Sequence, residues 1–570
     1  MSAGPMNAER LLAHYEKIAD APDAIARLRR FVLDLAVRGK LVPQDASDEP
    51  ASELLKRIAK EKARLVKAGE IRKPKVLADV EEPPFDLPQN WCWTPIREVT
   101  SDRGQEIPQS TFTYIDVTAI NKEAGIVAEP KVLEASEAPS RARKITRKGD
   151  VIYSCVRPYL LNVAVIECDF DPQPIASTAF AILNGHGLVI PRYIWIVLRS
   201  PFMVECVEEN QRGQAYPAIN DADFAVLPFP LPPLAEQQRI VAKVDELMGL
   251  CERLEAARGG REAVRDRLAA ASLARLNAPD PGTFQADARF ALDALPALTT
   301  RPDQIKALRQ TILNLAVRGK LVEQDPTDET ASELLKRIAA EKAGNGKRQK
   351  ELPEIDAEEL GELPPNWSAV PLIALGTWAI GSGFPKNEQG QTDGPYFFLK
   401  VSDMNLPENN KFITTANNTI DDEAAMRMRA AIHPPGTIIF PKIGGAIATN
   451  KRRILTRGSA IDNNCLGITF ASDIVVEWAY LLMTTLDFTR YQAGTAVPAL
   501  QQGTLAGIPV GLPPLAEQHR IVAKVDALMA LCDRLEAALI TADTTRARLL
   551  EALLHEALEP AAEAVTEAAE

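Results

Sequence analysis

The feature that most constrains the fold of this chain is an internal duplication. The octapeptide LAVRGKLV stands at 35–42 and returns unchanged at 315–322, an offset of 280 residues. A 27-residue segment, LPPLAEQQRIVAKVDELMGLCERLEAA at 231–257, recurs at 512–538 with four changes. Because self-similarity at a fixed offset means that one structural unit is used twice, we expect two copies of a single arrangement within the 570 residues.

Between the repeated segments lie two stretches, 87–230 and 363–511, that share a framework and little else. Both open with a Leu-Pro-x-Asn-Trp run, both contain a Gly followed by a β-rich run, and both close with Ala-x-Pro-Ala. Short β-branched and aromatic runs broken by Gly, Pro and Asn-Asp clusters predict strands with turns and one or two helices. We call these stretches the first and second variable domains.

The repeated segments are predicted to form long helices. Apolar residues recur every three or four positions, which keeps one stripe on one face and, over several heptads, is typical of a coiled-coil seam. A single stripe of this kind is also compatible with a bundle core, but two copies offer each other a partner. The seam positions are Ile240, Val244, Leu247, Cys251, Leu254, Ile521, Val525, Leu528, Cys532 and Leu535.

The expected fold class is α+β, with two globular α/β domains that have mixed, β-rich cores. Long helices separate them and form an antiparallel coiled coil with pseudo-two-fold symmetry. If the first long helix ends near Leu276, it is about 60 Å long at 1.5 Å per residue. The predicted segments are an N-terminal helical segment at 1–86, the first variable domain at 87–233, a central helix at 234–276, a linker at 277–300, a second helical segment at 301–362, the second variable domain at 363–514 and a C-terminal helix at 515–570.

Composition and missing motifs exclude several classes of protein. No stretch approaches the ~18 apolar residues of a membrane span, so we expect a cytoplasmic protein. Seven cysteines without a C-x-x-C pair predict reduced thiols, and five scattered histidines give no metal-ligand spacing. There is no phosphate-binding G-x-x-x-x-G-K-[ST] loop and no Asn or Asp before Pro-Pro-aromatic. We therefore expect no catalytic or metal-binding residues in this chain.

The net charge of −12 argues against a protein that coats nucleic acid by charge alone, yet it allows local basic faces. Basic clusters beside the Gly-led strand of each domain favour phosphate contacts, and nearby Arg, Asn and Gln side chains have the paired donors that read base edges. A solvated charged loop is the alternative for each. The first-domain candidates are Arg103, Gln105, Arg141, Arg143, Lys144, Arg147, Lys148, Arg157, Tyr159, Arg212, Gln214 and Tyr216; those of the second are Ser382, Phe384, Lys386, Lys442, Asn450, Lys451, Arg452, Arg453, Gln492, Gln501 and Gln502.

The order of variable domain, LPPLAEQxRIVAKVDxLMxLCxRLEAA helix, second variable domain and the same helix again resembles the specificity subunit of type I restriction-modification enzymes. The LAVRGKLVxQD segments and the Gly-Ser-Gly-Phe-Pro loop at 381–385 are similar to that family's. The resemblance covers nearly the whole chain. It departs in the first domain's opening loop, 102–108, where no matching Gly-x-x-Pro-Ser-like pattern stands.

The resemblance implies a non-catalytic DNA-recognition subunit. Each variable domain would be a target recognition domain that reads one half of a bipartite, asymmetric site in double-stranded DNA through the major groove. The helices would dock two modification subunits, which methylate adenine with S-adenosylmethionine, and would set the spacer between the half-sites. Restriction subunits that use ATP and Mg would complete the assembly, and this chain would hold no cofactor itself. The alternatives are a coiled-coil scaffold that binds other proteins and a self-sufficient methyltransferase or nuclease.

Overall fold

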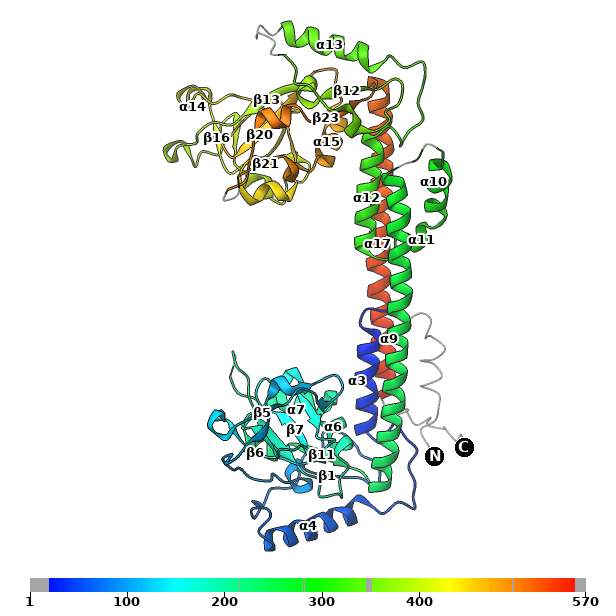
Figure 1. Cartoon of the computed structure of the whole chain (residues 1–570), viewed down its shortest axis with the longest axis vertical. Coiled ribbons are helices and arrows are strands. Elements are labelled where there is room, and N and C mark those ends of the chain that lie inside the picture. Colours follow the sequence, from blue (N-terminus) through cyan, green and yellow to red (C-terminus); the bar gives the residue numbers. More distant parts are fainter. Residues whose placement is uncertain are drawn as a thin grey trace, which may run out of the picture. The chain divides into compact units, whose positions relative to one another are not determined.

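The computed structural model describes residues 20–213, 215–278, 280, 282–344, 351–494 and 497–558 (Figure 1). The chain divides into two compact units. Unit 1 comprises 1–261 and 542–570, and unit 2 comprises 262–541. Each unit therefore contains one variable domain and a part of each long helix. Within the described residues no helix combines the length and the hydropathy that crossing a bilayer requires.

The secondary structure of unit 1 follows the predicted order of helix, β-rich domain and long helix. Its helices are α3 (Ala24–Val37), α4 (Ala51–Lys67), α5 (Ile96–Val99), α6 (Pro191–Arg199), α7 (Pro201–Asn210), α8 (Asp221–Ala225) and the start of α9 (Leu234–Asn277). Its strands are β1 (Cys92–Pro95), β2 (Phe112–Ile115), β3 (Ile120–Asn121), β4 (Ile126–Val127), β5 (Lys131–Leu133), β6 (Ala142–Ile145), β7 (Val151–Ser154), β8 (Val163–Val165), β9 (Pro174–Ser177), β10 (Phe180–Leu183) and β11 (Pro228–Leu231).

Unit 2 repeats that order. Its helices are α10 (Phe284–Asp293), α11 (Leu295–Leu298), α12 (Pro302–Val317), α13 (Ala331–Gly344), α14 (Asp422–Met428), α15 (Val476–Thr485), α16 (Gln502–Ala506) and the start of α17 (Leu515–Leu558). Its strands are β12 (Ser368–Pro371), β13 (Gly376–Ile380), β14 (Tyr396–Leu399), β15 (Phe412–Ile413), β16 (Thr419–Ile420), β17 (Ile438–Pro441), β18 (Arg453–Leu455), β19 (Ser459–Ile461), β20 (Cys465–Phe470), β21 (Gln492–Ala493), β22 (Ala499–Leu500) and β23 (Pro509–Leu512).

Both variable domains have mixed β cores. The first contains a five-stranded sheet in the order β10-β7-β8-β4-β3 and a four-stranded sheet in the order β5-β2-β9-β6. The second has a five-stranded sheet in the order β13-β20-β17-β18-β15 and a three-stranded sheet, β16-β14-β19. In each domain the first strand pairs antiparallel with the last, β1 with β11 and β12 with β23, so that the chain enters and leaves at one place. The predicted α+β class is confirmed.

The first turns of each long helix belong to a domain core. Ile240 and Val244 of α9 are fully buried in the cluster that contains the apolar side chains of α6 and β11. Ile521 and Val525 of α17 take the same place in the second domain. The predicted seam therefore begins as part of the globular core and continues along the helices.

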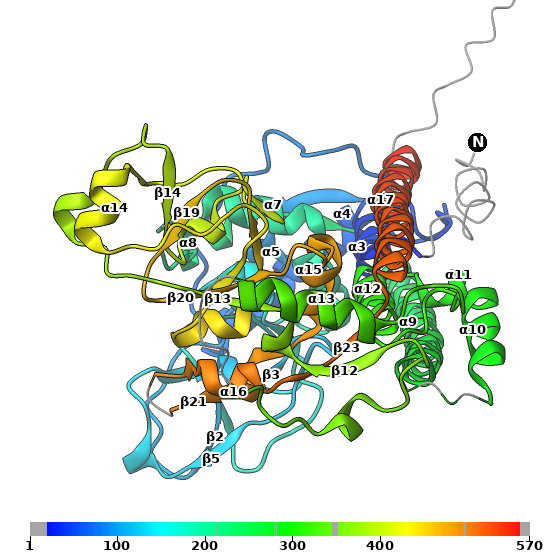
Figure 2. The same cartoon turned by 90° about the horizontal axis from the view of Figure 1, so that it is seen from above.

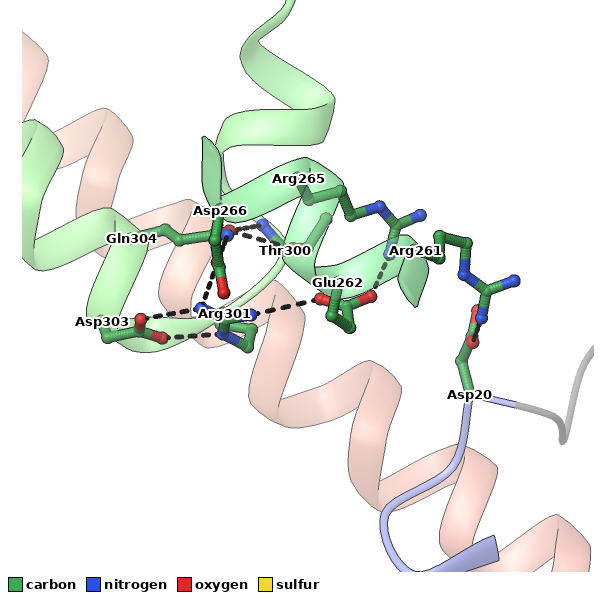
Figure 3. A network of polar contacts seen from close by, with 9 residues as sticks. All are labelled: Asp20, Arg261, Glu262, Arg265, Asp266, Thr300, Arg301, Asp303 and Gln304. Atoms are coloured by element: carbon green, nitrogen blue, oxygen red, sulfur yellow. Dashed lines mark hydrogen bonds and ion pairs between the residues drawn. The ribbon is translucent and has the colours of Figure 1, made fainter. Parts of the chain in front are cut away.

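In unit 2 the short helix α12 contacts both long helices. Arg301, just before α12, pairs with Glu262 and Asp266 of α9 (Figure 3), and Thr311 near its other end bonds with Asn277, so α12 runs parallel to α9. Arg309 of α12 pairs with α17 at Asp533, whereas the following loop meets the start of α17, so these two run antiparallel. Figure 2 shows α12 beside α9 and α17 in the view from above. Within unit 2 the two long helices are therefore antiparallel.

Unit 1 contains the equivalent bundle. Arg29 of α3 pairs with Glu255 of α9 at 2.7 Å, as Arg309 pairs with Glu536 in unit 2 at 2.9 Å. The N-terminal end of α3 packs through Ala24 on Leu550 and Leu553 of α17. The unit boundaries, 261/262 and 541/542, lie 280 residues apart, so the same division is made in both copies. Each unit thus combines the first part of one long helix with the last part of the other.

The segment 277–300 contains more structure than the predicted linker. The helices α10 and α11 form there, and their apolar residues Ala291 and Leu298 are buried against Leu273 and Leu276 of α9. Pro296 stands in the first turn of α11, where a missing N–H is tolerated. Pro296 therefore begins a helix, and the apolar residues of α10 and α11 decide how the segment packs.

Candidate nucleic-acid interface

Two loops of the first variable domain are joined edge to edge. The backbone N–H of Arg157, which follows β7, donates to the carbonyl of Pro217 at 2.8 Å. Within the closing loop, Arg212 and Ala218 exchange two backbone hydrogen bonds, of 2.8 and 2.9 Å. The guanidinium of Arg157 lies 4.8 Å from the centroid of the Tyr216 ring. The structure thus brings together the two loops that the sequence proposed separately.

The side chains at this junction are suited to contact bases. Tyr216 is 69% exposed and Tyr159 is 49% exposed, so both rings are open to contact from outside the domain. Arg212 is exposed and pairs with Asp223 at 2.9 Å. Aromatic faces stack on bases, and a guanidinium makes paired hydrogen bonds to guanine. Gln214, also a candidate, lies outside the described residues.

The second variable domain has the same junction with different side chains. The N–H of Gly444, after β17, donates to the carbonyl of Pro498 at 2.7 Å, and Ile443 bridges to Ala499 as Val156 bridges to Ala218. Arg157 and Gly444 are equivalent, and both have left-handed φ angles, 49° and 77°. The backbone is therefore kept while the exposed side chains differ.

The residues predicted from the sequence include 450–453 but none of the loop 443–449. The signal that could have found it is the Gly-led strand, since Ile443 follows β17 as Val156 follows β7. The stretch 450–453 was predicted to contact DNA only because it is basic.

The basic stretch of the first domain does not form one edge. Strand β6 alternates, so Ala142 and Lys144 are buried while Arg143 is half-exposed, and Arg141 just before the strand is exposed. Lys144 is 4% exposed, and its Nζ lies 2.7 Å from Asp102 and 3.5 Å from Asp221. Its charge is therefore satisfied inside the domain. Arg147 and Lys148, beyond the strand, are exposed.

The opening loop of the first domain contains two of the predicted residues. Arg103 binds a carboxylate within the domain, and Gln105 is exposed. Nε of Arg103 donates to Asp150 at 2.7 Å, and Asp150 is fully buried, with a pKa that burial raises. Arg103 therefore compensates a buried carboxyl group. Gln105 is exposed and bridges through its backbone to Lys144 of β6. This bridge places the opening loop beside the basic strand.

In the second domain, the two arginines of the predicted cluster belong to the fold. Arg452 is 2% exposed, donates to the carbonyls of Met483 and Leu486, and lies 3.9 Å from the ring of Phe488. Burial lowers its pKa to about 9. Arg453 donates to the carbonyls of Met404 and Asn409. The guanidinium of Arg452 cannot reach DNA without leaving the core, whereas Arg453 is half-exposed and is held by two carbonyls.

The remaining second-domain candidates lie in several places. Asn450 donates to the carbonyl of Thr484 and accepts from Arg452, and Lys451 donates to Asn405. Phe384 stacks on Phe398 at 3.7 Å between ring centroids, so its ring supports the domain. The others are half-exposed or exposed on loops and short elements: Ser382, Lys386, Lys442, Gln492, Gln501 and Gln502.

The described residues contain no group of three His, Cys, Asp or Glu side chains placed to hold a metal ion. The exposed Arg212, Tyr159 and Tyr216 of the first domain offer charge, hydrogen bonds and stacking, which are interactions that bases accept.

Comparisons with known proteins agree on one family. Residues 384–542 match the family model described as type I restriction modification DNA specificity domain. The chain is 32% identical to the specificity subunit of the type I restriction enzyme EcoAI and 30% identical to that of EcoEI, both from Escherichia coli. Each alignment covers 94% of this chain and 94% of the relative.

A solved structure shares the fold. A chain from a study of complex assembly and conformational transition of the type I R-M system is 24% identical, with a TM-score of 0.51. The alignment covers 83% of this chain and 99% of that one. The HsdS subunit from Thermoanaerobacter tengcongensis is 23% identical, with a TM-score of 0.47 over 84% of this chain and 99% of its own.

Proposed function

The chain belongs to the specificity subunits of type I restriction-modification systems, and we propose that its two variable domains each read one half of a bipartite, asymmetric DNA site. The family makes it a DNA-recognition subunit. The proposal assigns the two halves of the target to the two domains, each through the major groove.

The observation that carries this proposal is the repeated loop junction. Arg157 and Pro217 make in the first domain the backbone bond that Gly444 and Pro498 make in the second. The exposed side chains around it differ between the domains. A fixed backbone frame with different hydrogen-bonding groups is what two readers of different short sequences require, because base edges are distinguished by their donor and acceptor patterns.

The duplicated helices support a second part of the proposal, the docking of two modification subunits. Each unit contains the same combination of a short helix with parts of both long helices. The chain therefore presents the same kind of surface twice, once in each unit. Two identical partners then attach with pseudo-two-fold symmetry. The partners supply adenine methylation with S-adenosylmethionine, and restriction subunits supply cleavage with ATP and Mg, in the cytoplasm.

A domain exchange tests the assignment. Residues 87–230 are replaced by the corresponding domain of a related specificity subunit, and methylated adenines are mapped in the genome of cells that contain the modification subunit. We expect one half of the methylated sequence to change and the other half to stay. The reciprocal exchange of 363–511 is the matched control and should change the opposite half. A change in both halves, or in neither, contradicts the assignment.

A further inference from the structure

A groove in unit 1 lies between the loop that follows α4 and the edge of the first variable domain. Its two connected cavities, of about 780 and 670 Å³, share Gly69, Ile71, Ser101 and Arg103 among their lining residues. We call this feature the basic groove. Five of the residues predicted from the sequence line it: Arg103, Gln105, Lys144, Arg147 and Lys148.

The charge of the basic groove is opposite to that of the chain. Nine Lys and Arg side chains line it against four Asp and Glu, whereas the whole chain has a formal net charge of −12. Burial lowers the pKa of His186 in its wall to about 4, so this ring is neutral at pH 7. The positive charge therefore comes from groups that remain cationic at neutral pH.

Some of these cations are committed to the fold and others are free. Lys62, which is buried, donates to the carbonyls of Arg97 and Glu98 at 2.7 and 3.2 Å. By contrast, Arg72, Lys73 and Lys75 are exposed, and within the described part of the chain their side chains have no hydrogen bond or ion pair. Three unpaired cations on one loop have no structural task in the folded chain.

The wall of the groove also contains a polar group without a partner. Ser101 is 7% exposed, and within the residues that the structure describes its Oγ has no hydrogen-bond partner, although both cavities reach this residue. The Oγ atom itself is shielded from solvent, so it lies out of reach of a ligand in the groove.

The position of the groove points to DNA. Its wall includes Gln105 and Lys144, which bridge the opening loop to β6, and β6 is flanked by the exposed Arg141 and contains Arg143. The second copy has Lys347, Arg348 and Lys350 at the corresponding place after α13, outside the described residues. Both copies thus keep a basic segment there although its sequence has changed.

We propose that the basic groove binds phosphate groups of the DNA backbone next to the first half-site, with Arg72, Lys73 and Lys75 as the contacting cations. This inference rests on the proposed function, and it adds a sequence-independent interaction to it. An acidic segment of a partner subunit is negatively charged, as DNA phosphate is, and is the competing occupant of the basic groove.

The test is a salt titration of duplex binding by the full-length chain. The triple variant R72A/K73A/K75A is compared with wild type on a duplex that carries the methylated sequence and on a scrambled duplex. The slope of log K against log salt is negative, and its magnitude decreases by about 0.9 for each phosphate that is no longer neutralised. We therefore expect the magnitude to decrease by up to about 3 on both duplexes. The mapped methylation sequence should stay the same, because cations that bind the backbone do not read bases.

A matched control removes the same charge elsewhere. R253A/R267A/R289A changes three exposed arginines of α9 and α10 and should leave the slope as in wild type.

The outcomes separate the two proposals. If wild type binds duplex and the triple variant keeps the wild-type slope, the groove proposal is wrong and the proposed function stands. If the triple variant instead loses only its modification subunit in a pull-down, the acidic segment is the occupant and the phosphate proposal is wrong. If wild type binds neither duplex, with or without the modification subunit, both proposals are wrong.

Discussion

Nε1 of Trp91 donates a hydrogen bond of 2.9 Å to Oε2 of Glu236, and Trp367 makes the same bond of 2.9 Å to Glu517. The tryptophan ends the Leu-Pro-x-Asn-Trp run that opens each variable domain, and the glutamate stands in the first turn of each long helix. The other carboxylate oxygen of Glu236 accepts from Gln44 at 2.6 Å. Two motifs far apart in the sequence thus fix each domain on its helix.

Trp91→Phe should therefore destabilise the first domain. Burial raises the pKa of Glu236 and the bond from Trp91 lowers it, so the variant raises that pKa further. A carboxyl whose folded pKa is raised contributes stability below its ordinary pKa and loses it as the pH rises through the folded pKa. We expect a deficit of about 1–3 kcal/mol at pH 7 that shrinks toward pH 4, measured by denaturant unfolding.

Trp93→Phe is the control for this pair. Its Nε1 donates at 3.1 Å to the carbonyl of Phe85, which does not titrate in this range. The decrease in the free energy of unfolding of Trp93→Phe should be independent of pH. If the decrease in Trp91→Phe is also independent of pH, the carboxylate of Glu236 does not account for the effect of Trp91.

Replacing Arg157 by Gly and by Ala separates backbone strain from recognition. At φ 49° a residue with a Cβ is in the left-handed region, which costs of order 1 kcal/mol and which Gly adopts freely. Both variants lose the guanidinium, so both should alter one base preference in the first half-site. Only Arg157→Gly should recover stability, by about 1 kcal/mol relative to Ala. Equal melting temperatures of Arg157→Gly and Arg157→Ala would contradict backbone strain at this position.

Arg141 and Lys144 should behave differently despite their proximity. The double variant R141A/R143A should reduce the salt slope of DNA binding by about 0.9 for each phosphate left without its cation, and its stability should stay near wild type. Lys144→Ala leaves the half-exposed Asp102 without its buried partner and should destabilise the chain by about 1–3 kcal/mol. A thermal melt and a salt titration of the two variants distinguish the roles, and a stable Lys144→Ala variant would return that residue to the surface.

The length of the long helices is proposed to set the spacer of the target. Four residues inserted after Ala257 and four after Ala538 lengthen both helices by about 6 Å at 1.5 Å per residue. The methylated sequence should then gain about two base pairs between its halves, at about 3.4 Å per base pair. Methylation mapping reads the spacer directly. The insertion in α9 alone disturbs the pairing with α3 and is the control for loss of folding, and an unchanged spacer in the double insertion contradicts the ruler.

The duplication by itself determined the order of the elements, the pairing of two variable domains with two long helices, and the seam. Cys251 and Cys532 illustrate this, because their heptad positions predict burial and they are 5% and 1% exposed. Periodicity reports which face of a helix is apolar, and that information is local. The motifs that recur in both copies likewise had to meet common partners, as Trp91 and Glu236 do.

Only the tertiary structure decided which polar residues are free. Lys144 and Arg452 look like surface cations in the sequence, yet Asp102 and the carbonyl of Met483 hold them. Arg72 and Lys73 are not among the residues predicted from the sequence to bind DNA, yet they line a groove. The reason is physical: the fate of a charge depends on partners that are distant in the chain, and one sequence contains no record of which distant groups meet.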